Sequence, residues 1–286
     1  MRSRIRAMDS AVYRRVRNAP AAGDEPPAYT GPLDLVPGAV VAYSLRAMSA
    51  AWVGNAIRLR EDGGDTEANF TTAVGNAIDT AEVTAFLNGA GGHGSVWYDQ
   101  SGNGYNCLAS SDFPGDQPVW SLSVVGGKPG FVVIPETSGE FRTAETNISL
   151  PNGACTVFMV CRGTVETRLG GASMSFFGGS TAVNTLNDGT HLAAYDYAGL
   201  VDDAAVYLVD SAWEFGTNDY KVNGTSLVGT DFDTAAVDPI TGYICVALNL
   251  TSVSVVEVLV YSTLLSSANR LAIRQNIATY YGITLP

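Results

Sequence analysis

Histidine, cysteine and charged residues are scarce in this sequence. Only two of the 286 residues are histidine (His93 and His191), four are cysteine, and no Cys-x-x-Cys pair occurs. This scarcity argues against a zinc site and a disulfide framework. Cys155 and Cys161 lie on the same face of one apolar run, too far apart to bridge each other. We therefore expect all four cysteines to be small buried residues.

Long apolar runs and an export signal are also absent. No apolar stretch reaches the roughly 18 residues that a membrane-spanning helix needs. The basic N-terminus is not followed by the apolar segment of a secretory signal, although an organelle transit peptide remains an alternative. No phosphate-binding loop, dinucleotide fingerprint or Ser-His-Asp arrangement is present. The sequence thus predicts neither a membrane span nor a signal peptide.

The few charged residues, 15% of the chain, are unevenly distributed. The first 17 residues contain six arginines and one acidic residue, a charge of about +5. The rest of the chain contains 10 basic and 27 acidic residues, a charge of about −17. An acidic body repels nucleic-acid backbones and anionic membranes, so we expect neither to be its ligand.

The N-terminal arm, residues 1–18, has apolar residues at helical spacing between its arginines. A helix this short is unstable alone in water, so the arm is either a solvated tail or a segment that orders on an acidic partner surface. Residues 19–38 contain five prolines and predict an extended linker, and we expect the globular body to span 39–286. The expected docking residues are Arg2, Arg4, Arg6, Arg14, Arg15, Arg17, Ile5, Met8, Val12 and Val16.

The sequence of the body predicts many short strands. Runs of β-prone residues alternate with Gly, Asn, Asp, Ser and Pro, which is typical of an all-β sandwich. The Asn-Gly pair at 223–224 predicts a hairpin turn. The predicted strands cover residues 39–45, 56–60, 95–100, 131–134, 155–161, 175–179, 191–197, 205–210, 219–224, 242–248 and 254–262.

Two helices are expected within this β-rich body. One begins at an Asp-x-x-Glu cap, Asp79 to Glu82, and ends before Gly89. The other runs from about Ser267 and ends before Gly282. The second helix has an apolar face, so we expect it to cover one end of the sandwich.

Two parts of the chain resemble known proteins. The segments AYSLRAMSAAWVGNAIRLRE and DTAEVTAFLNGAGGHGSVWYDQSGNGYN resemble the N-terminal half of the catalytic domain of fungal α-L-arabinofuranosidase B, a pattern that also occurs in bacteriophage virion proteins. The closing VVEVLVYSTLLSSANRLAIRQNIATYYGI resembles the end of concanavalin A-like, laminin-G-like domains. The resemblance covers most of residues 40–107 and 243–283. It implies a concanavalin A-like jelly-roll sandwich of two antiparallel sheets, with a few short helices and a C-terminal helix.

The enzyme's activity does not carry over with this fold. A retaining glycosidase needs two carboxylates across one sugar site. The resembling enzyme's acid/base Asp lies in a Gly-Gly-Asp-Asn segment, which matches Asn249 here, and an amide has no proton to donate. The resembling enzyme's nucleophile Glu lies in a Met-Glu-Ala segment, and the only possible counterparts here are Glu166 and Glu214. The enzyme also has two adjacent cysteines, and this sequence contains no Cys-Cys pair. We therefore expect no catalysis.

Several other motifs have both a structural and a functional interpretation. For WYDQSGNG (97–104) we favour side-chain turns and positive-φ glycines over a sugar-binding loop. The acidic turn 61–65 lacks the spacing of a recognised calcium motif, so we expect no cofactor, although calcium stays compatible with it. We interpret His93 as a loop residue because no acid partner can be placed. Core packing is the default for the candidate sugar-stacking residues Trp52, Trp120 and Trp213.

Taken together, the sequence predicts a non-catalytic structural or adhesion protein of a bacteriophage particle, such as a tail fibre, spike, baseplate or decoration component. The arm would bind other virion proteins, and the sandwich would project outward in an oligomeric assembly, where its expected partner is either host-surface glycan or neighbouring subunits. One alternative is a glycoside hydrolase of the α-L-arabinofuranosidase type. A second alternative is a cellular carbohydrate-binding module.

Overall fold

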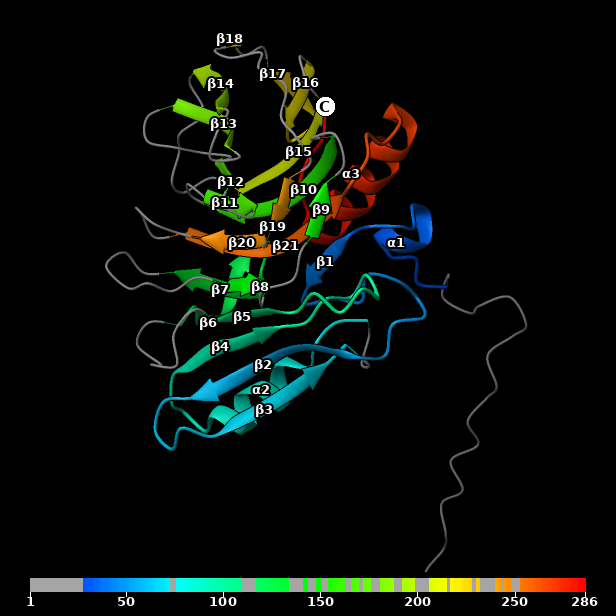
Figure 1. Cartoon of the computed structure of the whole chain (residues 1–286). Helices are drawn as coiled ribbons and strands as arrows, with labels where there is room; N and C mark the ends of the chain where they lie inside the picture. The colour runs from blue at the N-terminus through cyan, green and yellow to red at the C-terminus, as the bar shows by residue number, and fades with distance from the viewer. Residues whose placement is uncertain are drawn as a thin grey trace, which may run out of the picture.

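The computed structural model describes residues 28–72, 76–109, 117–133, 141–143, 148–150, 154–162, 166–169, 172–175, 181–187, 192–198, 206–214, 217–227, 230–231, 240–242, 244–247 and 253–286 (Figure 1). Its helices are α1 (Pro32–Leu35), α2 (Thr80–Leu87) and α3 (Ser267–Tyr281). Its strands are β1 (Val41–Ser44), β2 (Asn55–Glu61), β3 (Glu67–Thr71), β4 (Gly92–Trp97), β5 (Cys107–Ala109), β6 (Val119–Val125), β7 (Lys128–Val133), β8 (Phe141–Thr143), β9 (Ile148–Leu150), β10 (Cys155–Arg162), β11 (Glu166–Leu169), β12 (Ala172–Ser175), β13 (Thr181–Asn187), β14 (Leu192–Ala198), β15 (Val206–Glu214), β16 (Thr217–Val222), β17 (Thr225–Leu227), β18 (Thr230–Asp231), β19 (Ile240–Gly242), β20 (Ile244–Ala247) and β21 (Val253–Tyr261).

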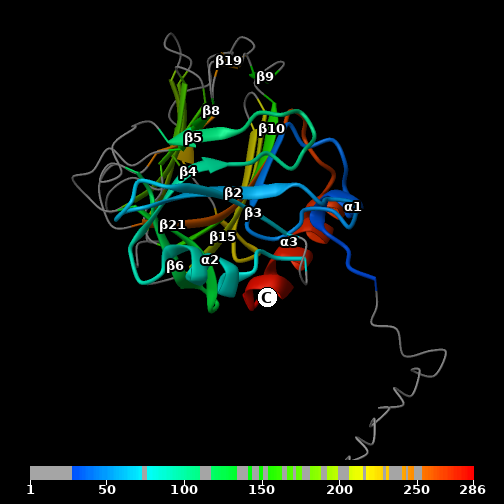
Figure 2. The same ribbon diagram turned by 90° about the horizontal axis from the view of Figure 1, so that it is seen from below.

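The strands form an antiparallel sandwich, as the sequence predicts. Nineteen of them belong to one continuous pairing network, and β9 pairs separately with β19. The order β1–β21–β10–β15–β16 runs through the middle of the molecule. Figure 2 shows β2 and β4 crossing in front of β10 and β15, which places them in a second layer. This arrangement confirms an all-β sandwich with a few short helices and a C-terminal helix.

The central strands are buried on both faces, which explains their unbroken apolar runs. In β10, Val157 and Met159 pack into the core between the two layers, whereas Phe158 and Val160 face the α3 side. Neighbouring β21 has a register shift opposite Val160 and Cys161. An extra residue at such a bulge changes which side chains face each side of the sheet.

Both predicted helices are present and are capped at their first turns. The Asp79 carboxylate accepts hydrogen bonds from the backbone N–H groups of Ala81 and Glu82, which satisfies two donors at the start of α2. Helix α3 begins after Ser266, whose hydroxyl accepts from the Asn269 N–H, and ends at Gly282 with φ 70°. The sequence therefore located both helices correctly.

The predicted Asn-Gly hairpin is also confirmed, since Asn223 and Gly224 connect β16 to β17 with positive φ angles. Three of the four cysteines, Cys107, Cys155 and Cys161, are buried free thiols. The side chain of Cys245, the fourth, lies outside the described residues.

The expected linker needs a correction over its second half. Residues 28–38 do not act as a free spacer: the Tyr29 hydroxyl donates to the Ala47 carbonyl, and α1 packs against α3. The Val36 carbonyl accepts from the buried Tyr261 hydroxyl at 2.8 Å. Apolar Val36 packs into the core on the α3 side. The sandwich therefore begins before Ala39, because this proline-containing segment carries its own apolar anchors.

None of the helices in the described ranges has the length and apolar character that crossing a membrane requires. The N-terminal arm, with all ten of its expected docking residues, lies outside the described residues.

Candidate functional site

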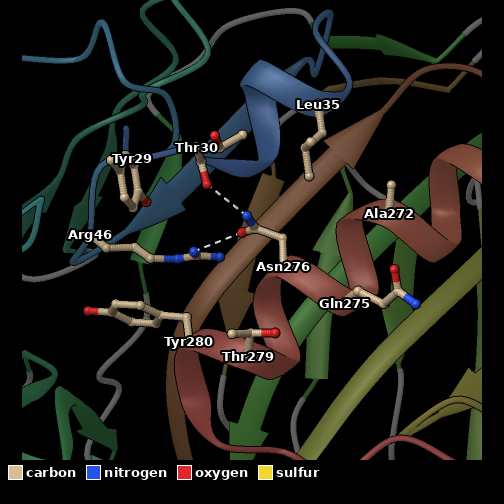
Figure 3. A pocket seen from close by; sticks show the side chains of 9 residues that line it. All are labelled: Tyr29, Thr30, Leu35, Arg46, Ala272, Gln275, Asn276, Thr279 and Tyr280. Atoms are coloured by element: carbon tan, nitrogen blue, oxygen red, sulfur yellow. Dashed lines mark hydrogen bonds between the residues drawn. The ribbon is translucent and has the colours of Figure 1, made fainter. Parts of the chain in front are cut away.

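A cavity of about 560 Å³ lies between the segment before β1 and the outer side of α3 (Figure 3). Segments from opposite ends of the chain form its walls, and a buried arginine from the turn after β1 reaches into it. Its volume is in the range of small-molecule sites. The lining residues are Tyr29, Thr30, Leu35, Arg46, Ala272, Gln275, Asn276, Thr279 and Tyr280.

Arg46, which lines this cavity, forms an ion pair with Glu257 of β21. Two parallel hydrogen bonds join them, Nε to Oε2 and Nη2 to Oε1, both 2.8 Å long. Oε2 of Glu257 also accepts from the hydroxyls of Ser44 at 2.9 Å and Tyr281 at 3.1 Å. Burial alone lowers the pKa of Arg46, but the Glu257 carboxylate outweighs burial and raises this pKa above its ordinary value. Arg46 therefore keeps its charge, which the adjacent Glu257 carboxylate balances.

A tyrosine from α3 braces the arginine from its other side. The ring of Tyr280 lies 4.5 Å from the Arg46 guanidinium carbon and 4.6 Å from Nζ of Lys128. Such cation–π contacts favour Arg46 in this position. Burial raises the pKa of Tyr280 to about 12, so its hydroxyl stays protonated and able to donate at neutral pH.

Asn276 fixes the two walls relative to each other. Its Oδ1 accepts from Nη1 of Arg46 at 2.9 Å, and its Nδ2 donates to the Thr30 carbonyl at 2.8 Å. Figure 3 shows these two bonds as one bridge from α3 to the N-terminal wall. These two hydrogen bonds thus connect the opposite walls of the cavity and orient Arg46 and Asn276.

A second, smaller cavity of about 340 Å³ lies beside α2, and one of the three candidate stacking tryptophans lines it. Trp120 on β6 forms part of its wall, together with the glycine-rich backbone of residues 89–92. Trp120 is itself buried and packs edge-on against Phe131 in the core. Trp52 is half-buried, and the side chain of Trp213 lies outside the described residues. Core packing is therefore the observed role of Trp120.

The WYDQSGNG motif builds structure, as we interpreted it. The Asp99 carboxylate accepts from the N–H groups of Ala42, Ser101 and Tyr105 and from the Ser101 hydroxyl. The Gln100 side chain donates through Nε2 to the carbonyls of Ser44 and Arg46 and accepts through Oε1 from the Met48 N–H. Gly102 and Gly104 have φ values of 92° and 79°, which only glycine adopts at no steric cost. The motif thus ties β4 to β1 and holds the backbone around Arg46.

The interpretation of His93 as a loop residue without an acid partner is wrong. His93 belongs to β4, and its Nε2 lies 2.6 Å from Oδ1 of Asp62. The antiparallel pairing of β2 with β4 brings the two residues together, although 31 positions separate them. Its Nδ1 lies 3.3 Å from the Gln117 carbonyl, so the ring is held at both nitrogens.

The acidic turn 61–65 directs its carboxylates to separate partners. Glu61 accepts from the N–H groups of Gly63 and Gly64, Asp62 contacts His93, and Asp65 lies 3.4 Å from Arg60. Among the described residues, no cluster of three or more His, Cys, Asp or Glu side chains is arranged to hold a metal ion.

The argued catalytic positions are described only in part. Glu166 begins β11 and pairs with Ala247, the last residue of β20, whereas Glu214 ends β15 and pairs with Thr217 across its own hairpin. Their side chains and the whole of Asn249 lie outside the described residues. The backbone thus places Glu166, and not Glu214, on a strand beside the one that leads to Asn249.

The three buried carboxylates among the described side chains all have structural partners: Asp99, Asp210 and Glu257. Oδ1 of Asp210 accepts from Nε of Arg270 at 2.7 Å, and Oδ2 accepts from Nη1 of Arg274 at 2.8 Å. Burial raises the pKa of Asp210 despite these two arginines, yet its side chain has no exposed surface that a substrate could reach.

Comparison with known proteins supports the fold. No protein-family model matches the chain, and no curated protein matches it. A solved GH54 α-L-arabinofuranosidase soaked with a cyclic sulfate inhibitor superposes with a TM-score of 0.61 at 16% identity, over 88% of this chain and 66% of that enzyme. An arabinofuranosidase complexed with arabinofuranosyl-α-1,2-xylobiose gives a TM-score of 0.60 at 14% identity, over 88% and 65%. The chain thus spans about two thirds of these enzymes, and identity this low shows the fold alone.

Proposed function

We propose that this chain is a non-catalytic carbohydrate-binding module that its N-terminal arm attaches to a larger assembly. Two observations support the binding part of this proposal. The sandwich has the fold of enzymes that bind arabinofuranosides. It also has a cavity of a size suited to a small ligand, whose surface is mainly apolar and includes several hydrogen-bonding side chains.

The non-catalytic part of the proposal rests on the hydrogen-bond partners of the buried carboxylates that the structure describes. A glycosidase acid must hold a proton within reach of the leaving oxygen, and its partner carboxylate must face the same sugar. Asp99, Asp210 and Glu257 instead give their oxygens to backbone N–H groups, hydroxyls or arginines. Among the described side chains, these three buried carboxylates therefore make structural contacts, which supports the non-catalytic part of the proposal.

The arm supports the finer proposal of a bacteriophage virion protein. Its six arginines are attached to an acidic body, so an acidic surface on another virion protein would attract the arm and repel the body. In this proposal the arm docks on the particle, and the sandwich faces host-surface glycan. Deleting residues 1–18 tests it: we expect a folded body that no longer joins its assembly, and normal incorporation of the shortened chain would refute it.

A direct test of the proposed function pairs a glycan array with a hydrolysis assay on the same preparation. We expect retention of at least one glycan class and no release of 4-nitrophenol from 4-nitrophenyl α-L-arabinofuranoside. Retention of no glycan would contradict carbohydrate binding. A cellular carbohydrate-binding module, the second alternative, would bind glycan equally well but would not need the arm for any assembly.

One observation favours the glycosidase alternative. Glu166 lies on β11, directly beside the strand that leads to Asn249, which is where the resembling enzyme has its acid. If turnover is found, Glu166→Gln should abolish it and Glu214→Gln should leave it unchanged. That pair of results would establish an arabinofuranosidase and overturn the proposed function.

A further inference from the structure

We infer that the cavity between Tyr29 and α3 is the carbohydrate site, and that its ligand is a neutral saccharide without carboxylate or sulfate groups. This inference rests on the proposed function and gives it a location. The described lining residues come from the segment before β1, the turn after β1 and α3, and none of them is one of the positions argued for catalysis, Glu166, Glu214 and Asn249.

Charge determines the class of ligand. Among the described lining residues, Arg46 is the only one that carries a charge at neutral pH, and Glu257 balances this charge through two 2.8 Å hydrogen bonds. An acidic sugar would gain no net attraction from this neutral pair and would lose its own hydration. The acidic body would also repel such a sugar. A neutral saccharide meets neither penalty.

The rim provides the hydrogen-bonding groups that sugar hydroxyls need. Gln275 and Thr279 lie one turn apart on α3, and both are exposed at the cavity. An amide and a hydroxyl each donate and accept, so together they can bond hydroxyls in either orientation. The protonated Tyr280 hydroxyl adds a donor. Leu35 and Ala272 line the same cavity and offer apolar contact to the C–H faces of a sugar ring.

The walls are fixed before a ligand arrives, which lowers the entropic cost of binding. Asn276 already bridges Arg46 and the Thr30 carbonyl, and Tyr29 already donates to the Ala47 carbonyl. These bonds leave Gln275, Thr279 and Tyr280 as the groups that respond to a ligand. Tyr280 has both roles, because its ring contacts Arg46 and its hydroxyl can bond a ligand.

The test measures the affinity of the full chain for neutral oligosaccharides selected on the array, using isothermal titration calorimetry. Three variants probe the rim: Gln275→Ala, Thr279→Ala and Tyr280→Phe. We expect each to weaken binding by about 3- to 10-fold, as the loss of one or two hydrogen bonds would. Leu271→Ala is the matched control, because Leu271 is exposed on the same helix but does not line the cavity.

Each outcome has one meaning. Weaker binding in the three variants, with unchanged binding in Leu271→Ala, supports the inference. Wild-type affinity in all three variants places the site elsewhere and overturns the inference, while the proposed function stands. Preferential binding of sialylated or sulfated glycans overturns the neutral-ligand part. If the unmodified chain binds no glycan at all, the proposed function itself fails.

Discussion

Arg46 and Glu257 are 211 positions apart in the chain and meet as a buried bidentate ion pair. Their side chains are 2% and 0% exposed, and the two hydrogen bonds between them are each 2.8 Å long. The pair connects the turn after β1 to β21, and its Arg46 side chain lines the cavity. One contact therefore stabilises the sandwich and sets the neutral charge of the candidate site.

Removing the carboxylate of Glu257 should be strongly destabilising. Glu257→Gln leaves the Arg46 charge buried without a counter-charge, and we expect the free energy of unfolding in urea to fall by about 3–5 kcal/mol. Glu67→Gln is the control, because Glu67 pairs with Arg58 and Arg60 at the surface and should lose less than about 1 kcal/mol. Equal losses in the two variants would contradict a structural role for the buried pair.

The turn that Asp99 organises should contribute nearly as much to the free energy of unfolding as the Arg46–Glu257 pair. Asp99→Ala removes the acceptor of four hydrogen bonds and leaves buried N–H donors unsatisfied. We expect a loss of roughly 3 kcal/mol or more in the same urea measurement. Asp79→Ala removes only the cap of α2 and should lose about 1 kcal/mol. A smaller loss for Asp99 than for Asp79 would show that WYDQSGNG does not hold the sheet.

The stability of the folded chain should depend on pH through the ionisation of Asp219. Partial burial raises the pKa of Asp219, but Lys221 and Arg270 outweigh burial and hold this pKa below the ordinary value of 3.8. Its stabilising contribution is therefore present above about pH 4 and is lost as pH falls through the lower folded-state value. We expect the stability difference between the unmodified chain and Asp219→Asn to be larger at pH 7 than at pH 2. A difference that grows on acidification would have the wrong sign.

The buried thiols should resist modification in the folded protein. Burial raises the pKa of both Cys107 and Cys155 to about 12, and it raises the pKa of Cys161 as well. Because the thiolate is the reactive form, these three should react with a thiol reagent only after denaturation. The measurement is mass spectrometry of peptides after a short native labelling. Fast labelling of Cys155 would contradict its place in the core.

The features that sequence reasoning predicted are the ones that local patterns specify. The β10 run, the Asp79 cap, the Gly282 stop and the Asn223–Gly224 turn each depend on neighbouring residues, and each was found where expected. The short strand β3 was missed, because its alternating polar residues Glu67 and Asn69 reduce the apolar signal.

The candidate site could not be predicted in the same way. Its pairs are brought together by tertiary structure: Asn276 with Thr30, Arg46 with Glu257, and His93 with Asp62. No spacing in the chain indicates such partners, since each pair depends on strand register or on how α3 packs. Proline content also misled us over residues 28–38, where the apolar anchor Val36 outweighs the extended tendency of the segment.

The most direct test of the central claim is native mass spectrometry of the full chain mixed with neutral oligosaccharides, arabinoxylan fragments among them. The account predicts a complex whose mass equals the protein plus one intact oligosaccharide, unchanged after prolonged incubation. A complex with shortened oligosaccharide, or free arabinose accumulating in the mixture, would contradict it by showing that this sandwich cleaves what it binds.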